Sequence, residues 1–375
     1  MIEPIDIGGR TVSQSEPCFI VAEAGTAHNG DLNRGIELID AAVDAGADCV
    51  KFQAVRADEI VHPNCGAIAL PGGRISIYDT FAEIERDEAF FRSLCEHCRK
   101  RSITFLCAPF GLETQAMLAR IGVPAYKIAS PELNHFPLID ACASAGVPCI
   151  VSTGVSLLSD IEAAVDRLTS APVSVALLHC VTNYPAPPAM YNLRVVESLR
   201  QLFGLHVGVS DHTLQTDLVP VLAVSVGASI IEKHITLSKR GAGLDDPLAL
   251  SPVEFGNMVE QVRMAESDPD TASLETTRRY GHKLVEAVLG DGVKRLASSE
   301  AEYYHTTNRS IISIRRIGRG EAFSRGNVRL LRSETNIEPG LPPRFLDEIL
   351  KRRAFRDIRD GAGITWADVG ERDVI

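Results

Sequence analysis

Residues 148–181 read PCIVSTGVSLLSDIEAAVDRLTSAPVSVALLHCV, and this stretch places an amphipathic run between two short apolar runs. Pro148–Gly154 and Val173–Val181 have the length and the branched aliphatic residues of buried strands, whereas Ser159–Ser170 carries apolar residues at helical spacing. A strand, a helix and a second strand in this order are typical of a parallel βα unit. The stretch therefore predicts an α/β fold.

The same alternation extends outward from Cys18 to about Glu266. It contains eight strand candidates: Cys18–Gly25, Cys49–Gln53, Thr104–Phe110, Ala125–Ser130, Pro148–Gly154, Val173–Val181, His206–His212 and Ile230–Leu237. Helix candidates between and after them include Asp31–Ala45, Glu88–Arg101, Asn192–Phe203, Asp217–Val226 and Pro252–Ala265. Eight such units predict a (β/α)8 TIM barrel over residues 1–266. The long insertions, 54–87 and 182–191, follow strands, and that side of a barrel is the catalytic face.

After the barrel the rhythm changes. Residues 267–307 are polar with helical stretches and are predicted to be a linker. Residues 308–375 combine short β-like pieces (Ser310–Ile314, Val328–Leu331, Ala354–Phe355) with Gly and Pro turns and one helix, Pro343–Leu350. A β-rich unit of this size is marginal alone, so we expect it to pack against a partner.

Composition excludes several classes of protein. The formal net charge of −11 over 375 residues opposes binding to nucleic acid. An N-terminus without an apolar core segment, and the absence of any apolar run long enough to span a membrane, favour a cytoplasmic protein. Nine cysteines without a repeated framework fit reduced, buried thiols, and the lone pair Cys95 and Cys98 lacks the further ligands of a zinc site.

Polar side chains gather where the predicted strands end. They are Glu23, Lys51, Gln53, Lys127, Ser130, Glu132, Ser152, His179, Tyr184, Ser210, His212, Glu232, Lys233 and His234. Each alone could be an ordinary hydrogen-bonded core residue. Together they would place unpaired buried charge at one rim, which is costly without a ligand.

The residue types indicate the chemistry. Lys51 and Lys127 with serine hydroxyls suit a phosphate and a carboxylate. His212 and His234, which end adjacent strands, can share one divalent metal and leave positions open for water or a carbonyl oxygen. Glu23 and Glu132 are candidates for proton transfer or for holding sugar hydroxyls.

Several motifs occur together in one order. They are Ala22-Glu23-Ala24-Gly25 with His28-Asn29-Gly30, Lys51-Phe52-Gln53, Lys127-Ile128-Ala129-Ser130, Ser152-Thr153-Gly154, His179-Cys180 with Tyr184-Pro185, Ser210-Asp211-His212-Thr213 and Glu232-Lys233-His234. In this order and spacing the chain resembles the sialic acid (N-acetylneuraminate) synthase family, which makes nonulosonic acids. Its residues 308–369 resemble the family's C-terminal antifreeze-like SAF domain, a β-clip fold.

The resemblance implies a reaction and a site. Phosphoenolpyruvate would be held by Lys51, Lys127, Ser130, Ser152 and Ser210, and Mn²⁺ or Mg²⁺ by His212 and His234. Catalytic roles would fall to Glu23, His234, Tyr184 and Asp245, and further substrate contacts to Gln53 and Glu132. C3 of phosphoenolpyruvate would attack the aldehyde of an amino sugar, water would add at C2, and phosphate would leave. The resemblance also implies a domain-swapped homodimer in which Arg309 reaches the sugar of the other subunit.

Three departures from the family pattern limit the transfer of roles. Ala108 stands where the family usually has a phosphate-binding Thr, Asp245-Asp246 replaces the usual Asp-His, and the insertion Leu70–Asp79 lacks the usual Lys-Tyr-Gln. The acceptor sugar therefore stays open between N-acetylmannosamine, a diacetamido-dideoxy hexose and a spore-coat precursor. Two alternatives stay open: an enzyme that condenses phosphoenolpyruvate with another aldose, and a barrel that binds sugars or anions without catalysis.

Overall fold

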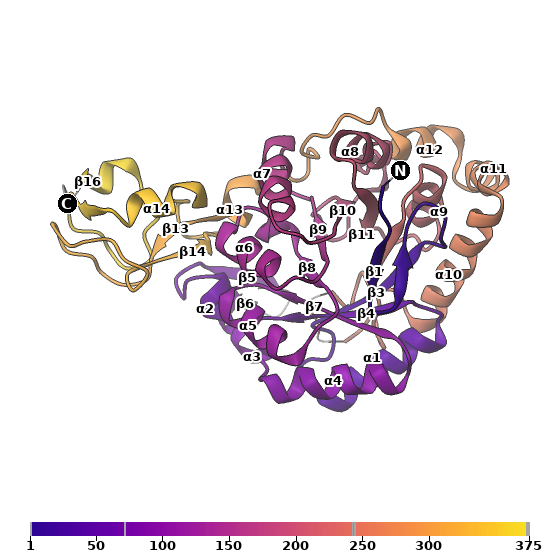
Figure 1. The fold of residues 1–375 in the computed structure, drawn as a ribbon, viewed down its shortest axis with the longest axis horizontal. Helices are drawn as coiled ribbons and strands as arrows, with labels where there is room; N and C mark the ends of the chain where they lie inside the picture. Colours follow the sequence, from indigo (N-terminus) through magenta and orange to yellow (C-terminus); the bar gives the residue numbers. More distant parts are fainter. Residues whose placement is uncertain (1, 71–72, 242, 244, 373–375) are drawn as a thin grey trace.

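The computed structural model describes residues 2–70, 73–241, 243 and 245–372. Its centre is a closed barrel of eight parallel strands (Figure 1). In order around the barrel these are β3 (Phe19–Gly25), β4 (Cys49–Ala54), β7 (Thr104–Pro109), β8 (Tyr126–Ile128), β9 (Cys149–Ser152), β10 (Val175–Cys180), β11 (His206–Asp211) and β12 (Ile230–His234), which pairs with β3 again. The predicted (β/α)8 barrel is confirmed, and every predicted strand is present.

Helices form the outer layer of the barrel (Figure 1). They are α1 (Leu32–Asp44), α4 (Glu88–Lys100), α5 (Leu112–Ile121), α6 (Phe136–Ser144), α7 (Leu158–Thr169), α8 (Val195–Phe203), α9 (Leu218–Ser225) and α10 (Pro252–Ser267). Local signals set their ends. Asp31 accepts from the first backbone N–H groups of α1, and Gly122 ends α5 at a φ of +79°, which glycine adopts without strain.

An N-terminal hairpin, which the sequence pattern did not reveal, closes the bottom of the barrel. Its strands β1 (Ile5–Ile7) and β2 (Arg10–Val12) pair antiparallel. Ile5, Ile7 and Val12 pack with the inward residues at the starts of the barrel strands, such as Phe19. Because this end is filled with apolar side chains, the open end of the barrel is the one where the strands finish.

The long insertion after β4 folds into its own small elements. These are α2 (Ala57–Ile60), a hairpin of β5 (Ala67–Leu70) and β6 (Gly73–Ser76), and α3 (Ile77–Ile84). Residues 71 and 72, at the tip of the hairpin, lie outside the described residues.

The sequence predicts a polar linker with helical stretches over residues 267–307, and helices are present there. The segment contains α11 (Pro269–Tyr280), α12 (His282–Leu289) and the short α13 (Tyr304–Thr307). Helix α11 packs against α9 and α10, and the hydroxyl of Tyr280 donates to Asp217. In α12 the buried apolar stripe consists of Val285 and Val288. Because the stripe is so narrow, the sequence of this segment has a mostly polar composition.

The C-terminal module contains β13 (Arg309–Ser313), β14 (Val328–Arg332), η3 (Pro343–Phe345), α14 (Leu346–Ile349), β15 (Arg352–Ala354), η4 (Trp366–Asp368) and β16 (Val369–Arg372). The pairs β13–β14 and β15–β16 are both antiparallel. The module projects from one side of the barrel (Figure 1). A second apolar cluster joins it to the barrel, because Ile312 and Leu331 pack with Val61 and Phe110.

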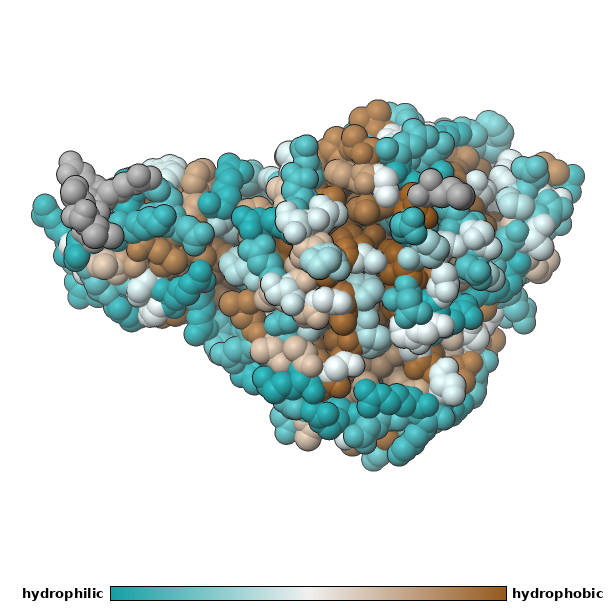
Figure 2. Space-filling view, viewed as in Figure 1, coloured by the Kyte–Doolittle hydropathy of each residue, from teal (hydrophilic) through white to brown (hydrophobic). Residues whose placement is uncertain are grey.

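Across the described residues, no helix is both long enough and apolar enough to span a membrane. On the face shown in Figure 2, hydrophilic side chains cover much of the module and the outer helices, while hydrophobic ones gather near the middle of the barrel. All nine cysteines are free and buried, and Cys95 and Cys98 are part of the core around α4.

Candidate active site

A cavity of about 310 Å³ opens where the barrel strands end. Eleven of the predicted site residues line it: Glu23, Lys51, Gln53, Lys127, Ser130, Ser152, Tyr184, Ser210, His212, His234 and Asp245. They come from seven different strands or from the loops that follow them. The fold therefore brings together side chains that are more than 200 positions apart in the sequence.

Lys51 lies at the centre of the cavity floor and is buried. Its Nζ is 2.6 Å from Oε2 of Glu23 and 3.6 Å from Oε2 of Glu232. Burial alone would lower the pKa of Lys51, but the two carboxylates outweigh burial and raise it well above its usual value. The ammonium therefore stays charged and is held in one place by Glu23, which also accepts a hydrogen bond of 2.7 Å from Gln53.

Lys127 is paired less completely. Its Nζ donates to Oγ of Ser152 at 2.6 Å, while the nearest carboxylate oxygen, on Glu232, is 3.8 Å away. Burial lowers the pKa of this lysine, and Glu232 only partly opposes that effect. A buried ammonium with one short hydrogen bond to a hydroxyl is suited to receive an anion.

Glu232 is a site residue that the sequence analysis placed on a strand but gave no role. Its carboxylate lies between Lys51 and Lys127 and accepts a 2.9 Å hydrogen bond from Ser210. Burial raises its pKa, but the two lysines outweigh burial and lower the pKa to about 2. A signal existed in the sequence, because residues two apart on a strand share a face and Glu232 stands two before His234.

Lys233 points the other way. Its Nζ is 2.5 Å from Asp211 and also donates to the carbonyl oxygens of Thr213 and Gln215. This lysine does not line the cavity. It holds the loop after β11, which carries His212, so its contribution is to the framework of the site.

His212 and His234 face the cavity with ring centroids 5.6 Å apart. Nδ1 of His212 donates to the carbonyl oxygen of Val181 at 2.8 Å, which leaves the lone pair of the ring on Nε2. Nε2 lies 3.3 Å from the hydroxyl of Tyr184 and 3.4 Å from that of Ser210. Burial, and to a lesser degree His234, lowers the pKa of His212 to about 3. Tyr184 stacks on His212 at 4.2 Å and is half-exposed, and Asp245 lies 3.7 Å from His234.

These two histidines fit a divalent metal. A neutral imidazole whose second nitrogen is bonded to a carbonyl is the usual state of a metal-bound histidine. Among the described residues no group of three or more His, Cys, Asp or Glu side chains is placed to hold a metal ion. A cation bound by His212 and His234 would therefore complete its coordination with water or substrate oxygens.

The three serine hydroxyls have different partners: that of Ser152 accepts from Lys127, and that of Ser210 donates to Glu232. Oγ of Ser130 accepts from the backbone N–H of Gly154 at 3.0 Å and contacts Sγ of Cys180 at 3.1 Å. Ala108, in contrast, is buried in the apolar cluster at the joint with the module. Position 108 therefore offers no hydroxyl group to a phosphate, unlike the threonine that the family usually has there.

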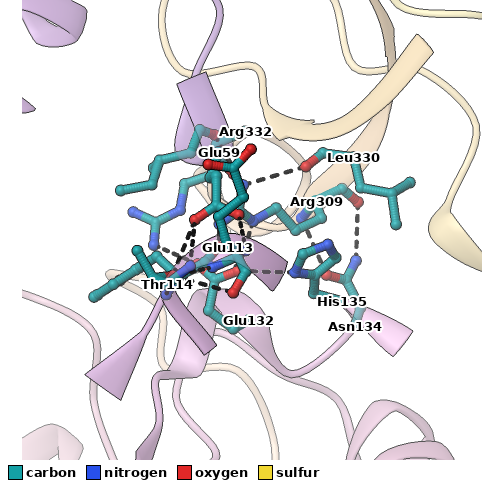
Figure 3. Close-up of polar contacts among 12 residues, drawn as sticks. Glu59, Glu113, Thr114, Glu132, Asn134, His135, Arg309, Leu330 and Arg332 are labelled. Atoms are coloured by element: carbon teal, nitrogen blue, oxygen red, sulfur yellow. Dashed lines mark hydrogen bonds and ion pairs between the residues drawn. The ribbon is translucent and has the colours of Figure 1, made fainter. Parts of the chain in front are cut away.

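Glu132 and Arg309 do not line the cavity, although both were predicted to bind substrate. Oε2 of Glu132 accepts from Nε of Arg309 at 2.6 Å, and Oε1 accepts from Arg332 at 2.7 Å (Figure 3). Arg309 also donates to the carbonyl oxygens of Glu59, Ile60, Phe110 and Leu330. Its guanidinium is completely buried within its own chain.

Within its own chain the guanidinium of Arg309 has no exposed surface, and its polar partners, Glu132 and four carbonyl groups, come from segments far apart in sequence. The predicted contact of Arg309 with a sugar in another subunit stays a prediction. The C-terminal part of the chain contributes three other residues to the cavity wall, Thr307, Arg332 and Glu334. No local pattern in the sequence distinguishes these three residues.

The two aspartates that depart from the family pattern have separate positions. Asp245 lines the cavity, whereas Asp246 is fully buried and accepts from Thr236 at 2.5 Å and from the N–H of Gly243 at 2.8 Å. Asp246 thus stabilises the loop after β12.

Comparison of the whole sequence with known families agrees with this site. A model of the NeuB family matches residues 38–272, and a model of the SAF domain matches residues 308–370. The chain belongs to the NeuB family. The predicted resemblance to sialic acid synthases with a C-terminal SAF domain is therefore confirmed.

Individual relatives of this NeuB-family chain cover nearly all of it. The spore coat polysaccharide biosynthesis protein SpsE of Bacillus subtilis is 35% identical over 371 residues, 98% of this chain and 97% of SpsE. The crystal structure of SpsE covers 99% of this chain and 100% of its own, with a TM-score of 0.83. The N,N'-diacetyllegionaminic acid synthase of Campylobacter jejuni is 32% identical over 346 residues, 90% of this chain and 97% of that enzyme.

A further solved structure is an N-acetylneuraminic acid synthetase from Leptospira borgpetersenii in complex with citrate. It is 32% identical, covers 80% of this chain and 95% of its own, and has a TM-score of 0.63. The NeuB-family protein described here is thus similar to synthases of several nonulosonic acids.

Proposed function

We propose that this NeuB-family protein is a nonulosonic acid synthase. It condenses phosphoenolpyruvate with the aldehyde of an N-acylated amino sugar and releases phosphate. One observation carries the proposal: two buried lysines, three serine hydroxyls and two histidines converge on a single cavity. Family membership supports it, as does the 32% identity with the N,N'-diacetyllegionaminic acid synthase of Campylobacter jejuni.

The donor is assigned to the lysine side of the cavity. Phosphoenolpyruvate carries a phosphate and a carboxylate. Lys127 donates to Ser152 at 2.6 Å and to the carbonyl oxygen of Ile128 at 3.4 Å, and its nearest carboxylate oxygen, on Glu232, is 3.8 Å away. An anion bound there would accept from the remaining N–H group of Lys127. Lys51, fixed by Glu23, adds a second positive charge.

The acceptor sugar is assigned to the histidine side. Tyr184 and Asp245 lie beside His212 and His234 and present a hydroxyl and a carboxylate to a sugar. When bound, a divalent cation would supply Lewis-acid polarisation of the aldehyde oxygen at this place. Glu23, within hydrogen-bond distance of Lys51 and Gln53, is placed to orient groups at the reacting carbons or to exchange a proton with them.

The reaction joins C3 of phosphoenolpyruvate to the aldehyde carbon. Water adds at C2, and cleavage of the bond between C2 and the phosphate oxygen releases inorganic phosphate. We propose N-acetylmannosamine or a diacetamido-dideoxy hexose as the acceptor class, because relatives are named for sialic, legionaminic and pseudaminic acids. The predicted homodimer stays a prediction, to be checked by light scattering.

A coupled assay of phosphate release tests the proposal. Purified protein is incubated with phosphoenolpyruvate, Mn²⁺ and each sugar in turn, with omission of metal as the control. Phosphate release that requires both the sugar and the metal is the expected result. Binding of phosphoenolpyruvate without turnover of any sugar would instead support the alternative of a binding protein that has lost catalysis.

A further inference from the structure

Glu334 is a wall residue of the cavity, and no donor among the described residues forms a hydrogen bond with its carboxylate. It lies in the turn after β14, in the C-terminal module, and lines the same cavity as Lys51 and His212. Within the described part of the chain, no hydrogen bond or ion pair engages its side chain. A partly buried carboxylate without donors is unfavourable unless a ligand supplies them.

The backbone of Glu334 is held in a strained conformation. Its φ is +52°, in the left-handed region that residues with side chains adopt at a cost. The surrounding contacts enforce this conformation. The N–H groups of Ser333 and Glu334 both donate to the carbonyl oxygen of Thr306, and those of Thr335 and Asn336 both donate to that of Cys65. Strain that the surroundings impose in this way is concentrated at binding and catalytic sites.

The strand that leads into this turn is also anchored. Arg332 lies two residues before Glu334 and donates to the buried Glu132 at 2.7 Å (Figure 3). Its guanidinium also lies over the ring of Phe110, 5.4 Å from the ring centroid. The backbone of Glu334 is therefore fixed from both sides before any ligand binds. A fixed backbone leaves only the side-chain torsions to be ordered when a ligand binds, which lowers the entropic cost of binding.

Charge decides which ligand Glu334 faces. Phosphoenolpyruvate is an anion, and a carboxylate would repel it. The acceptor sugar is neutral and carries O–H and acylamino N–H groups, which donate hydrogen bonds to a carboxylate.

We propose that Glu334 is a specificity-determining residue that accepts hydrogen bonds from the hydroxyl or acylamino N–H groups of the acceptor sugar. A residue of the C-terminal module thereby takes part in sugar selection. This inference rests on the proposed function, since it deepens the assignment of the acceptor.

Two substitutions separate recognition from structure. Glu334→Gln keeps the length of the side chain but weakens its capacity to accept, and Glu334→Gly removes the side chain and relieves the positive φ. Both are expected to raise the KM for the sugar by about tenfold or more, as for loss of a charge-assisted hydrogen bond, with the KM for phosphoenolpyruvate nearly unchanged. Neither is expected to lower the Tm. Glu338→Gln is the matched control, because Glu338 is exposed on the same module and does not line the cavity.

Calorimetric titration of N-acetylmannosamine and of a diacetamido-dideoxy hexose, with Mn²⁺ present, adds a measurement that needs no turnover. Weaker sugar binding by Glu334→Gln alone, beside normal binding by Glu338→Gln, supports the inference even if the wild-type protein releases no phosphate and the proposed function fails. The inference is overturned if Glu334→Gln binds sugar as the wild type does, or if Glu334→Gln and Glu338→Gln lose affinity for sugar equally. It is also overturned if the wild-type protein binds neither sugar.

Discussion

The mouth of the barrel and the joint between the barrel and the C-terminal module both bury charged groups, but they pair them differently. In the joint, Glu132 accepts hydrogen bonds from Arg309 and Arg332, and Arg309 also donates to four carbonyl oxygens. In the mouth, Lys51 pairs with Glu23 at 2.6 Å, but Lys127 lies 3.8 Å from its nearest carboxylate oxygen, on Glu232. Completely paired charges hold two parts of a chain together, whereas incompletely paired ones indicate a place for a ligand.

The largest expected effect is on stability, from Glu132→Ala. Removal of this carboxylate leaves Arg309 and Arg332 buried without a counter-charge. We expect the free energy of unfolding to fall by about 3–5 kcal/mol, measured by urea denaturation of the full chain. A loss below about 1 kcal/mol would contradict the view that this joint is structural.

The same joint predicts a pH dependence. Burial raises the pKa of Glu132, but Arg309 and Arg332 outweigh burial, and the pKa in the folded state is lowered. The stability that Glu132 contributes is therefore present above the unfolded pKa of about 4.3 and is lost as the pH falls through the lower folded value. The difference in stability between wild type and Glu132→Ala should shrink in that acidic range.

The second effect concerns the mouth. His212→Ala should lower phosphate release by about a hundredfold or more, because polarisation by a bound metal contributes several kcal/mol. Binding of Mn²⁺ measured by calorimetry should weaken in parallel. His97→Ala is the control, since His97 pairs with Asp40 on the outer helices. Unchanged metal binding and turnover in His212→Ala would show that the metal site was misassigned.

The third effect is a change in donor affinity. Lys51→Ala should raise the KM for phosphoenolpyruvate by about tenfold to a hundredfold, the scale of a charge-assisted hydrogen bond, and the KM for the sugar much less. Steady-state kinetics with each substrate varied in turn measures both. Lys239→Ala, which removes an exposed lysine paired with Glu254, should change neither. A larger effect on the sugar would reverse the assignment of the two sides of the cavity.

The smallest effect sharpens the comparison within the joint itself. Arg329 pairs with Asp58 at 2.8 Å across the same boundary, but both side chains are more than 40% exposed. Arg329→Ala should lower the free energy of unfolding by less than about 1 kcal/mol. A loss as large as that of Glu132→Ala would mean that burial is not what distinguishes the two ion pairs.

The sequence by itself determined the barrel and most of its mouth. Strand and helix periods are local signals, and the ends of parallel strands meet at one rim, so residues such as Lys51, Lys127 and His212 could be placed together without coordinates. Glu232 could have been added from its spacing to His234.

Only the tertiary structure decided which charged groups face the cavity and which face each other. Glu132 and Arg309 have the residue types of a substrate site, yet they pair with each other across 177 positions of sequence. Glu334 has no local signal, because its role depends on contacts of its turn with Thr306 and Cys65. Long-range pairing sets the direction of a side chain, and local sequence does not contain that information.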